Sequence, residues 1–362
     1  MQRTLLTATF SLLAIAVWAD GTHDASFTKE GLFKADVNKL TDTQLVVSPE
    51  MPLAPDQNML WCGTLQLAWN EAEKLVGEKM RFEPASPAVD LLNRGTFTRS
   101  DLDPGSYVAI ADFERNHVEA EIRAALEKTF HGAASPELIP PVPTNPGPYD
   151  FVAYCYLYKN LAFAKPFNDG SLLFGDTPVQ DFGFGQDAEN RPLDQVEIYD
   201  YKSDDDFIVE LKTTSPQDQL ILAKIGPGAT LQATIESVLQ RMTKPPQVAG
   251  VVDSLAVPKL NFDLRRDFQE LEGLILTPSP AAKIKGKLVI SKAEQLVRFQ
   301  LNKKGAILKS EAVIAMRALA MRSRYHLVFD KPFLILLKQK DSDQPYFALW
   351  VGNASLLVPE KK

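Results

Sequence analysis

The chain has few of the side chains from which metal sites are built, with two cysteines and four histidines in 362 residues. Protein zinc sites group Cys, His and carboxylate ligands at short spacings, and these histidines show no such spacing. We therefore expect no metal and no cofactor. The two thiols, Cys62 and Cys155, both lie in apolar runs. They could form a disulfide in an exported protein or stay as two buried thiols, and sequence spacing does not decide between these.

An excess of positive charge is also missing, since the formal net charge is −7. Binding to nucleic acid requires a concentrated positive field, so we expect no nucleic-acid partner. The Gly-x-Ser-x-Gly, phosphate-loop and His-Glu-x-x-His motifs are absent. Acidic runs such as 204-DDD-206 are typical of solvated surfaces rather than of acid/base pairs. These absences argue against an enzyme.

Long hydrophobic runs are missing outside the N-terminus. There, Arg3 precedes an apolar run from Leu5 to Val17, which is too short to span a bilayer well. Val17-Trp18-Ala19 places small residues at the positions that signal peptidase recognises. The pattern predicts that residues 1–19 are a signal peptide and that the protein is secreted or periplasmic. We expect no membrane association of the mature chain.

The first 150 residues read as an irregular arm followed by helices. Residues 20–57 are polar and punctuated by proline. Apolar residues at helical spacing predict helices within 58–78, at Asp90 to Arg94 and at Val118 to Phe130. The proline-rich stretch 135–150 cannot lie inside a helix or strand. It indicates a long surface connection or, alternatively, a domain boundary.

The remaining sequence is rich in strand patterns. The apolar and aromatic run from Asp150 to Tyr158 is typical of a strand buried on both faces. One further helix is expected, at Leu231 to Met242. Other strands are predicted at Val196–Tyr201, Asp206–Lys212, Gln219–Ile225 and Leu255–Leu264, and a C-terminal hairpin at Phe333–Lys338 and Tyr346–Gly352. Helices that precede strands indicate the α+β class. We expect one domain over 58–362, with a helical part (58–149) and a strand-rich core (150–362).

Five short motifs in the strand-rich core resemble the serpin family of serine protease inhibitors, in the order that the family shows. They cover roughly residues 150–358. The N-terminal part, 20–149, shows no motif of the family. The chain thus resembles a divergent serpin. The motifs are 157-LYKNLAFAKPF-167, 196-VEIYDYKSDDDFIVELKTT-214 with 219-QLILAKIGPG-228, 253-DSLAVPKLNFDLRRDFQEL-271, 297-VRFQLNKKGAI-307 and 329-FDKPFLILLKQKDSDQPYFALWVGN-353.

The resemblance implies a large mixed central sheet, a further sheet, a C-terminal hairpin and an exposed reactive-centre-like loop. Tyr154 to Leu161 would be an interior strand of the largest sheet. In the family, a protease cleaves the loop, and the loop then inserts as a new strand into the central sheet. The resemblance therefore implies a monomer that inhibits a serine-type protease and has no catalytic residues of its own. The alternative is a non-inhibitory binding or carrier protein with the same fold.

Residues after Gly305 would form the hinge and the inserted strand. Side chains alternate between the two faces of a strand, and one alternate set is small or apolar: Ala306, Leu308, Ser310, Ala312, Ile314 and Met316. The other set holds the charges, including Lys309 and Glu311. Leu308 is bulkier than the small hinge residues of the family, and overfilling a tight core costs about 1–3 kcal/mol. The same residues are good helix formers, so a helical loop that does not insert remains open.

The cleaved bond would lie between two arginines. In the family it lies about fourteen residues beyond the hinge glycine, which gives Leu319. Counting back from Pro332 by the usual spacing gives Met321. The candidate window is Arg317, Leu319, Ala320, Met321 and Arg322. A protease with a buried acid in its pocket would select an arginine, and one with an apolar pocket would select Leu319 or Met321.

Overall fold

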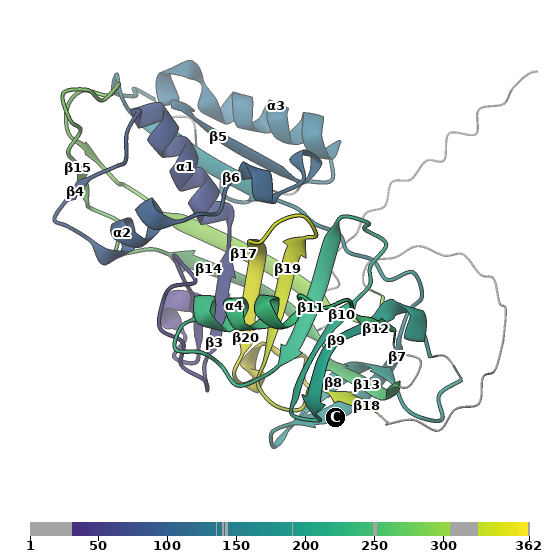
Figure 1. Cartoon of the computed structure of the whole chain (residues 1–362). Coiled ribbons are helices and arrows are strands. Elements are labelled where there is room, and N and C mark those ends of the chain that lie inside the picture. The colour runs from purple at the N-terminus through teal and green to yellow at the C-terminus, as the bar shows by residue number, and fades with distance from the viewer. Residues whose placement is uncertain are drawn as a thin grey trace, which may run out of the picture.

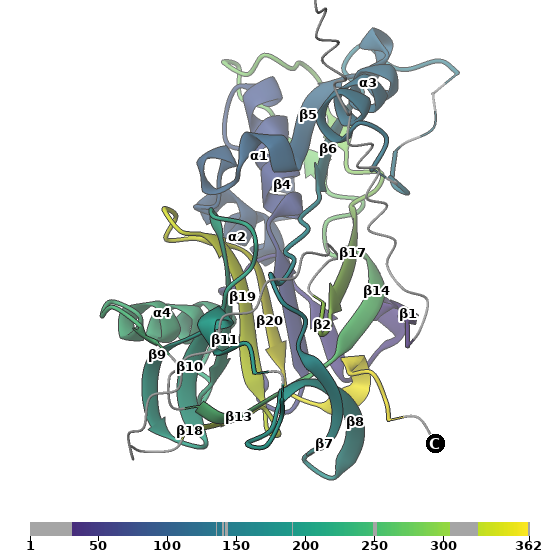
Figure 2. The ribbon, with the colours of Figure 1, turned by 90° about the vertical axis from the view of Figure 1, so that its right-hand side faces the viewer.

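The computed structural model describes residues 31–134, 136–139, 141, 144–189, 191–248, 252–304 and 325–360. The described part of the chain contains four α-helices, three of which precede residue 131, and five β-sheets. This confirms the predicted α+β class with helices mainly in the N-terminal part. Figures 1 and 2 show most of the strands gathered in the lower body of the molecule, with α1, α3, β4, β5 and β6 above them.

The largest sheet has eight strands in the order β12-β9-β10-β11-β19-β20-β3-β2. It is mixed, because β2 and β3 pair in parallel and the other neighbours pair antiparallel. Most of its inner strands are continuously apolar and buried, which is the pattern of strands covered on both faces. The bounds are β2 Thr43–Leu45, β3 Asn58–Cys62, β9 Val196–Ser203, β10 Asp206–Leu211, β11 Asp218–Lys224, β12 Gln247–Val248, β19 Phe333–Gln339 and β20 Pro345–Val351.

Helix α4 (Leu231–Arg241) covers one face of this sheet, as both views show (Figures 1 and 2). Its N-terminus is capped by Thr230, whose hydroxyl accepts a hydrogen bond from the Ala233 amide at 3.0 Å. Leu231, Ile235 and Val238 lie at helical spacing and are buried in the main core. The strands β19 and β20 form the predicted C-terminal hairpin in the middle of the sheet.

Three smaller sheets surround the large one. The first has the order β1-β14-β17 (Phe33–Asp36, Leu260–Asp267, Glu294–Leu301), and Phe299 of β17 stacks on Phe347 of β20 at 4.6 Å between ring centroids. The second has the order β18-β13-β8-β7 (Tyr325–Val328, Val252–Pro258, Thr177–Phe184, Asn168–Phe174). The third consists of the short strands β16-β15-β4 (Leu288–Val289, Ile275–Leu276, Phe82–Glu83).

The fifth sheet is the hairpin-like pair of β5 (Tyr107–Phe113) and β6 (Phe151–Leu157), which lies between two helices. Alternate side chains of β6 enter different clusters. Tyr154 and its even-numbered neighbours pack with α3 (Val118–Phe130). Cys155 and its odd-numbered neighbours pack with the main core beside α1 (Thr64–Val76). The pair is thus the middle of three layers. A short helix, α2 (Pro87–Arg94), completes the helical part.

Several sequence predictions are corrected by this architecture. The segment 58–62 is a strand, β3, and not the start of a helix, because all five of its side chains are buried in the large sheet. Helix α1 starts after Gly63, where a Cβ would lie 2.2 Å from the Phe97 ring. The alternating segment 255–264 is divided between β13 and β14, which belong to different sheets.

The prediction that Tyr154 to Leu161 is an interior strand of the largest sheet is wrong. The strand exists as β6, but it pairs with β5 alone in a two-stranded sheet. Its apolar and aromatic composition is explained by the helices on its two faces, which also make a strand apolar on both sides. The arm at 20–57 is irregular only in part, since its described residues include β1 and β2.

Candidate functional site

A large cavity separates β6 from β17. Its volume is about 1860 Å³, and its wall includes every residue of β6 and the segment from Lys287 to Phe299, which contains most of β17. No residue of β5 lines the cavity, and β14 contributes only Arg265. Because β5 and β14 are the partners of β6 and β17, the edges that face the cavity are the opposite, unpaired edges of these two strands. We call this space the gap.

The two strands that border the gap run in the same direction and are joined at one end. After β6 the chain reaches Phe163 and Phe167, and after β17 it reaches Lys303 and Lys304. The Phe163 amide donates to the Lys304 carbonyl at 3.2 Å, and the Phe167 amide donates to the Lys303 carbonyl at 2.9 Å. Since both strands lead to this joined end, β6 and β17 are parallel to each other. A chain that turned back directly after Lys304 would run antiparallel to both.

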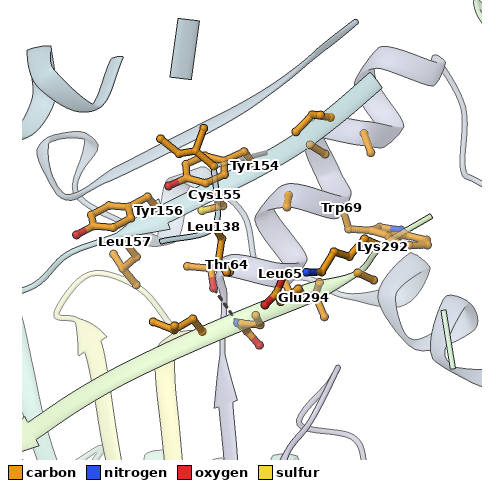
Figure 3. Close-up of a pocket in the computed structure, with 18 of the residues that line it drawn as sticks. Thr64, Leu65, Trp69, Leu138, Tyr154, Cys155, Tyr156, Leu157, Lys292 and Glu294 are labelled. Carbon is orange, nitrogen blue, oxygen red and sulfur yellow. Dashed lines mark hydrogen bonds and ion pairs between the residues drawn. The ribbon is translucent and has the colours of Figure 1, made fainter. Parts of the chain in front are cut away.

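Helix α1 and the main core form one wall of the gap. Thr64 and Leu65 of α1 lie opposite the start of β17 (Figure 3). The Gln295 side-chain amide donates to the Thr64 hydroxyl at 2.7 Å and to the Cys62 carbonyl at 3.0 Å, and these bonds fix the start of β17 to α1. The other side of the gap is lined by the segment after α3, including Leu138 and Ile139.

A buried ion pair holds the joined end of β6 against the large sheet. The Lys159 ammonium lies 2.9 Å from the Asp218 carboxylate, and both side chains are almost completely buried. Asp218 also accepts hydrogen bonds from the Tyr346 hydroxyl at 3.1 Å and from the Ser215 hydroxyl at 2.7 Å. Burial, with the nearby Asp218 carboxylate, raises the pKa of Tyr346 well above its usual value. The phenol therefore stays protonated and donates to Asp218.

A second charged cluster lies where β17 ends. Asp169 of β7 forms ion pairs with Lys303 and with Lys259, the latter at 2.7 Å. Beside it, Asp181 of β8 is buried over Gly170, whose missing Cβ would lie 2.2 Å from the carboxylate. Burial raises the pKa of Asp181 to about 6, with the Lys259 ammonium lowering it and the Asp169 carboxylate raising it.

The raised pKa of Asp181 predicts a pH-dependent gain in stability from the Asp181→Asn substitution. An unfolded aspartate has a pKa of about 3.9, so the native state binds more protons between about pH 4 and pH 6, and the wild-type loses stability as pH rises through that window. At pH 7.5 the free energy of unfolding of the variant should be higher by up to about 3 kcal/mol, because each tenfold change in proton affinity corresponds to about 1.4 kcal/mol. At pH 4 the gain should vanish.

Chemical denaturation of both proteins at pH 7.5 and pH 4 measures this difference. Asp194→Asn is the control, because Asp194 is exposed in its pair with Lys165, and it should change stability by less than about 1 kcal/mol. An equal change for Asp181→Asn at both pH values would contradict the account.

The two cysteines of the chain are both free and both line the gap. Cys62 ends β3 and is buried, and Cys155 lies on β6. Burial raises the pKa of each thiol, and the proximity of Cys62 raises that of Cys155 further. Of the two possibilities that the sequence leaves open, the structure has the two unpaired thiols.

The predicted hinge and bait residues lie outside the described residues. These are Gly305, Ala306, Leu308, Ser310 and Ala312, and the window Arg317, Leu319, Ala320, Met321 and Arg322. The predicted signal peptide lies outside them as well. Within the described ranges, no group of three or more His, Cys, Asp or Glu side chains could hold a metal ion. No helix of the described part is long and apolar enough to cross a membrane.

Sequence reasoning missed the two groups that shape the ends of the gap. The pairing of Lys159 with Asp218 had one signal, a lysine directly after the aromatic run of β6, which must find an anion if that part of the chain is buried. The contact of Gln295 with α1 had no sequence signal. The four side chains of the charged cluster come from β7, β8 and the ends of β13 and β17, and nothing in their spacing links them.

No protein-family model matches this chain, and no curated protein matches it either. Several solved structures that are similar to it are serpins. Serpin48 of the insect Tenebrio molitor is 17% identical, with 82% of this chain and 92% of that chain covered and a TM-score of 0.43. The mouse protein-Z dependent protease inhibitor is 14% identical, with 82% and 91% covered and a TM-score of 0.47.

A third similar structure is human thyroxine-binding globulin complexed with thyroxine, which is 17% identical, with 68% of this chain and 65% of that chain covered and a TM-score of 0.39. The similar structures thus include a protease inhibitor and a thyroxine-binding protein. These likenesses are loose, with every TM-score below 0.5, and they transfer no residue role to this chain.

Proposed function

We propose that this chain is a secreted, divergent serpin that inhibits a serine-type protease through cleavage and insertion of a bait loop. The proposal rests on two independent supports. One is the order of the five sequence motifs between residues 150 and 358. The other is the gap between β6 and β17, which is faced by the edges of these strands opposite their partners β5 and β14, as the addition of a strand requires.

The single observation that carries the proposal is the direction of the two strands at the gap. Because β6 and β17 are parallel and joined beside Lys304, the chain that continues from Gly305 begins at the joined end. If it turns back, it enters the gap antiparallel to both neighbours. Each edge then gains backbone hydrogen bonds, at a net of about 0.5–1.5 kcal/mol for each bond. The sheets β5-β6 and β17-β14-β1 would become one.

The sequence after Gly305 supplies a strand of suitable composition. The set that runs from Ala306 through Leu308, Ser310 and Ala312 would face the wall formed by α1 and the main core. The set with Lys309 and Glu311 would face the side of α3. In this assignment Gly305 and the first small residues act as the hinge, and the window from Arg317 to Arg322 carries the cleaved bond.

The chemistry of the reaction belongs to the protease. Its nucleophilic serine attacks the carbonyl carbon of the cleaved bond, the acyl ester forms, and the amine of the following residue leaves with the proton that the protease delivers. Insertion of the loop before hydrolysis carries the attached protease away from the joined end. Distortion of its oxyanion hole then slows attack by water on the ester. The chain therefore needs a gap and a hinge and no catalytic group.

Incubation with a panel of serine proteases tests this proposal. We expect a band of the summed mass that survives boiling in denaturant, and a C-terminal peptide, freed by the denaturant, that begins between residues 318 and 323. Cleavage without any such band, for every protease that cuts this window, would contradict inhibition.

A second candidate function is a carrier with the same fold. It is favoured by the bulk of Leu308 and by the helix-forming residues of the loop, which oppose insertion. The carrier predicts that a cut in the window leaves the melting temperature unchanged or lowers it, whereas an inserting loop raises it.

A further inference from the structure

One end of the cavity is distinct in composition from the rest. At the start of β17 the wall is formed by apolar side chains from α1, β4, β15 and β16 and from the residues that follow β16. We call this end the α1 pocket, and its members are Leu65, Trp69, Phe82, Leu276, Leu288 and Ile290. Figure 3 shows Leu65 and Trp69 on α1 beside Lys292 and Glu294.

The wall of the α1 pocket is formed before any ligand binds. The Trp69 ring lies 5.8 Å from the Phe82 ring, and Phe82 pairs with Leu276, which in turn pairs with Leu288. The Trp69 indole donates to the Asn93 side chain at 3.0 Å, so its polar group is satisfied, and the residue lines the cavity with 7% of its surface exposed. The Ile290 backbone donates to the Leu274 carbonyl at 3.0 Å and accepts from the Gly273 amide at 2.9 Å.

The charged groups at this end of the cavity are mainly positive. Arg265, Lys287 and Lys292 line it together with the Glu294 carboxylate, and the Glu272 carboxylate accepts from the nearby Ala293 amide at 3.3 Å. Glu294 forms ion pairs with both Arg265 and Lys292. Lys287 is exposed and has no ion-pair partner among the described residues. Three cations and two anions leave an excess of one positive charge beside an apolar wall.

We propose that the α1 pocket binds a long-chain monocarboxylate of the fatty-acid type. The hydrocarbon chain would lie along Leu65, Trp69 and the apolar strands, and the carboxylate would pair with Lys287 and Lys292. Ligand sites combine a mostly apolar wall with a few polar groups that fix orientation, and this pocket offers that combination. The excess positive charge selects an anionic head group over a cationic one. The apolar wall opposes phosphates and other small polyanions, which have no surface to bury there.

Quenching of tryptophan fluorescence by a dibrominated stearic acid tests the proposal on the full chain. We expect saturable quenching below the micellar concentration. Trp69→Phe should remove most of the quenching while the acid still displaces a fluorescent fatty-acid probe. Stearylamine should displace that probe at least tenfold less well, because its charge opposes Lys287 and Lys292.

One test variant and two control variants distinguish binding at the α1 pocket from nonspecific binding of the acid. The double substitution Lys287→Ala with Lys292→Ala should weaken binding of the acid by about tenfold, since charge-assisted contacts are lost. Lys285→Ala on the same loop should have no effect, because Lys285 does not line the cavity. Leu173→Ala, which removes the most exposed large apolar side chain of the described residues, should have none either.

Three outcomes would overturn the proposal: no saturable quenching, equal quenching of the Trp69→Phe variant, or equal displacement by the amine and the acid. The substituted lysines are exposed, and an unchanged melting temperature would show that the variants fold. All measurements use uncut protein without protease. The test therefore stands or fails separately from the proposed inhibition.

Discussion

Replacing Ala312 with arginine should abolish the denaturant-resistant complex while the loop is still cut. Ala312 belongs to the set that would face α1 and the main core once the loop inserts. An arginine at that place would be buried without a partner, at a cost of several kcal/mol. If this cost is added to the barrier for insertion, the loop inserts more slowly than water hydrolyses the acyl ester, and the protease is released. We expect the yield of complex on a gel to fall at least about tenfold, because each 1.4 kcal/mol on a barrier is tenfold in rate.

The neighbouring substitution Glu311→Arg is the matched control. Its side chain belongs to the opposite set, which already carries charge, so the complex should form with nearly the wild-type yield. Both variants should be cut at the same bond, as mass spectrometry of the released peptide would show. If Ala312→Arg forms the complex as well as Glu311→Arg does, the assignment of the two faces is wrong.

Replacing Lys159 with methionine should lower the free energy of unfolding by about 3–5 kcal/mol. The substitution removes the cation of a buried pair and leaves the Asp218 carboxylate in the interior, which is the most damaging way to break such a pair. Urea denaturation followed by fluorescence measures the loss. Lys165→Met is the control, because the pair of Lys165 with Asp194 is exposed and should contribute at most about 1 kcal/mol.

The double variant, in which Lys159→Met is combined with Asp218→Asn, sharpens this test. An amide is neutral and its oxygen still accepts the hydrogen bond from Tyr346, so most of the lost stability should return. If the double variant is as unstable as Lys159→Met alone, the loss comes from packing of the lysine stem rather than from the unpaired carboxylate.

The elements that local pattern determines were predictable from the sequence. Helix α3 spans Val118–Phe130 as predicted, because its apolar spacing and the glycine at 132 act within one segment. The hairpin of β19 and β20 follows from two apolar runs around a polar turn. The wrong placement of β6 in the largest sheet has a physical cause. A strand is buried on both faces whether helices or a second sheet cover it. Composition therefore predicts burial and says nothing of the hydrogen-bonding partner.

Only the part of the site that depends on local sequence, the loop after Gly305, was predictable. The alternation after Gly305 is a local property, and so is the position of the two arginines around the window. The gap depends instead on which strands remain unpaired, and pairing joins residues as distant as Phe163 and Lys304. The cluster of Asp169 with Lys259 and Lys303 likewise joins segments far apart in the chain.

Hydrogen exchange at β6 and β17, before and after one cut between residues 317 and 322, tests strand insertion most directly. The account predicts that amides of 151–157 and 294–301 exchange more slowly after the cut, since a strand then pairs with both edges that face the gap. It also predicts that the C-terminal peptide stays attached through β18, β19 and β20. Unchanged or faster exchange at both strands in the cut protein would show that the gap stays empty and would contradict the account.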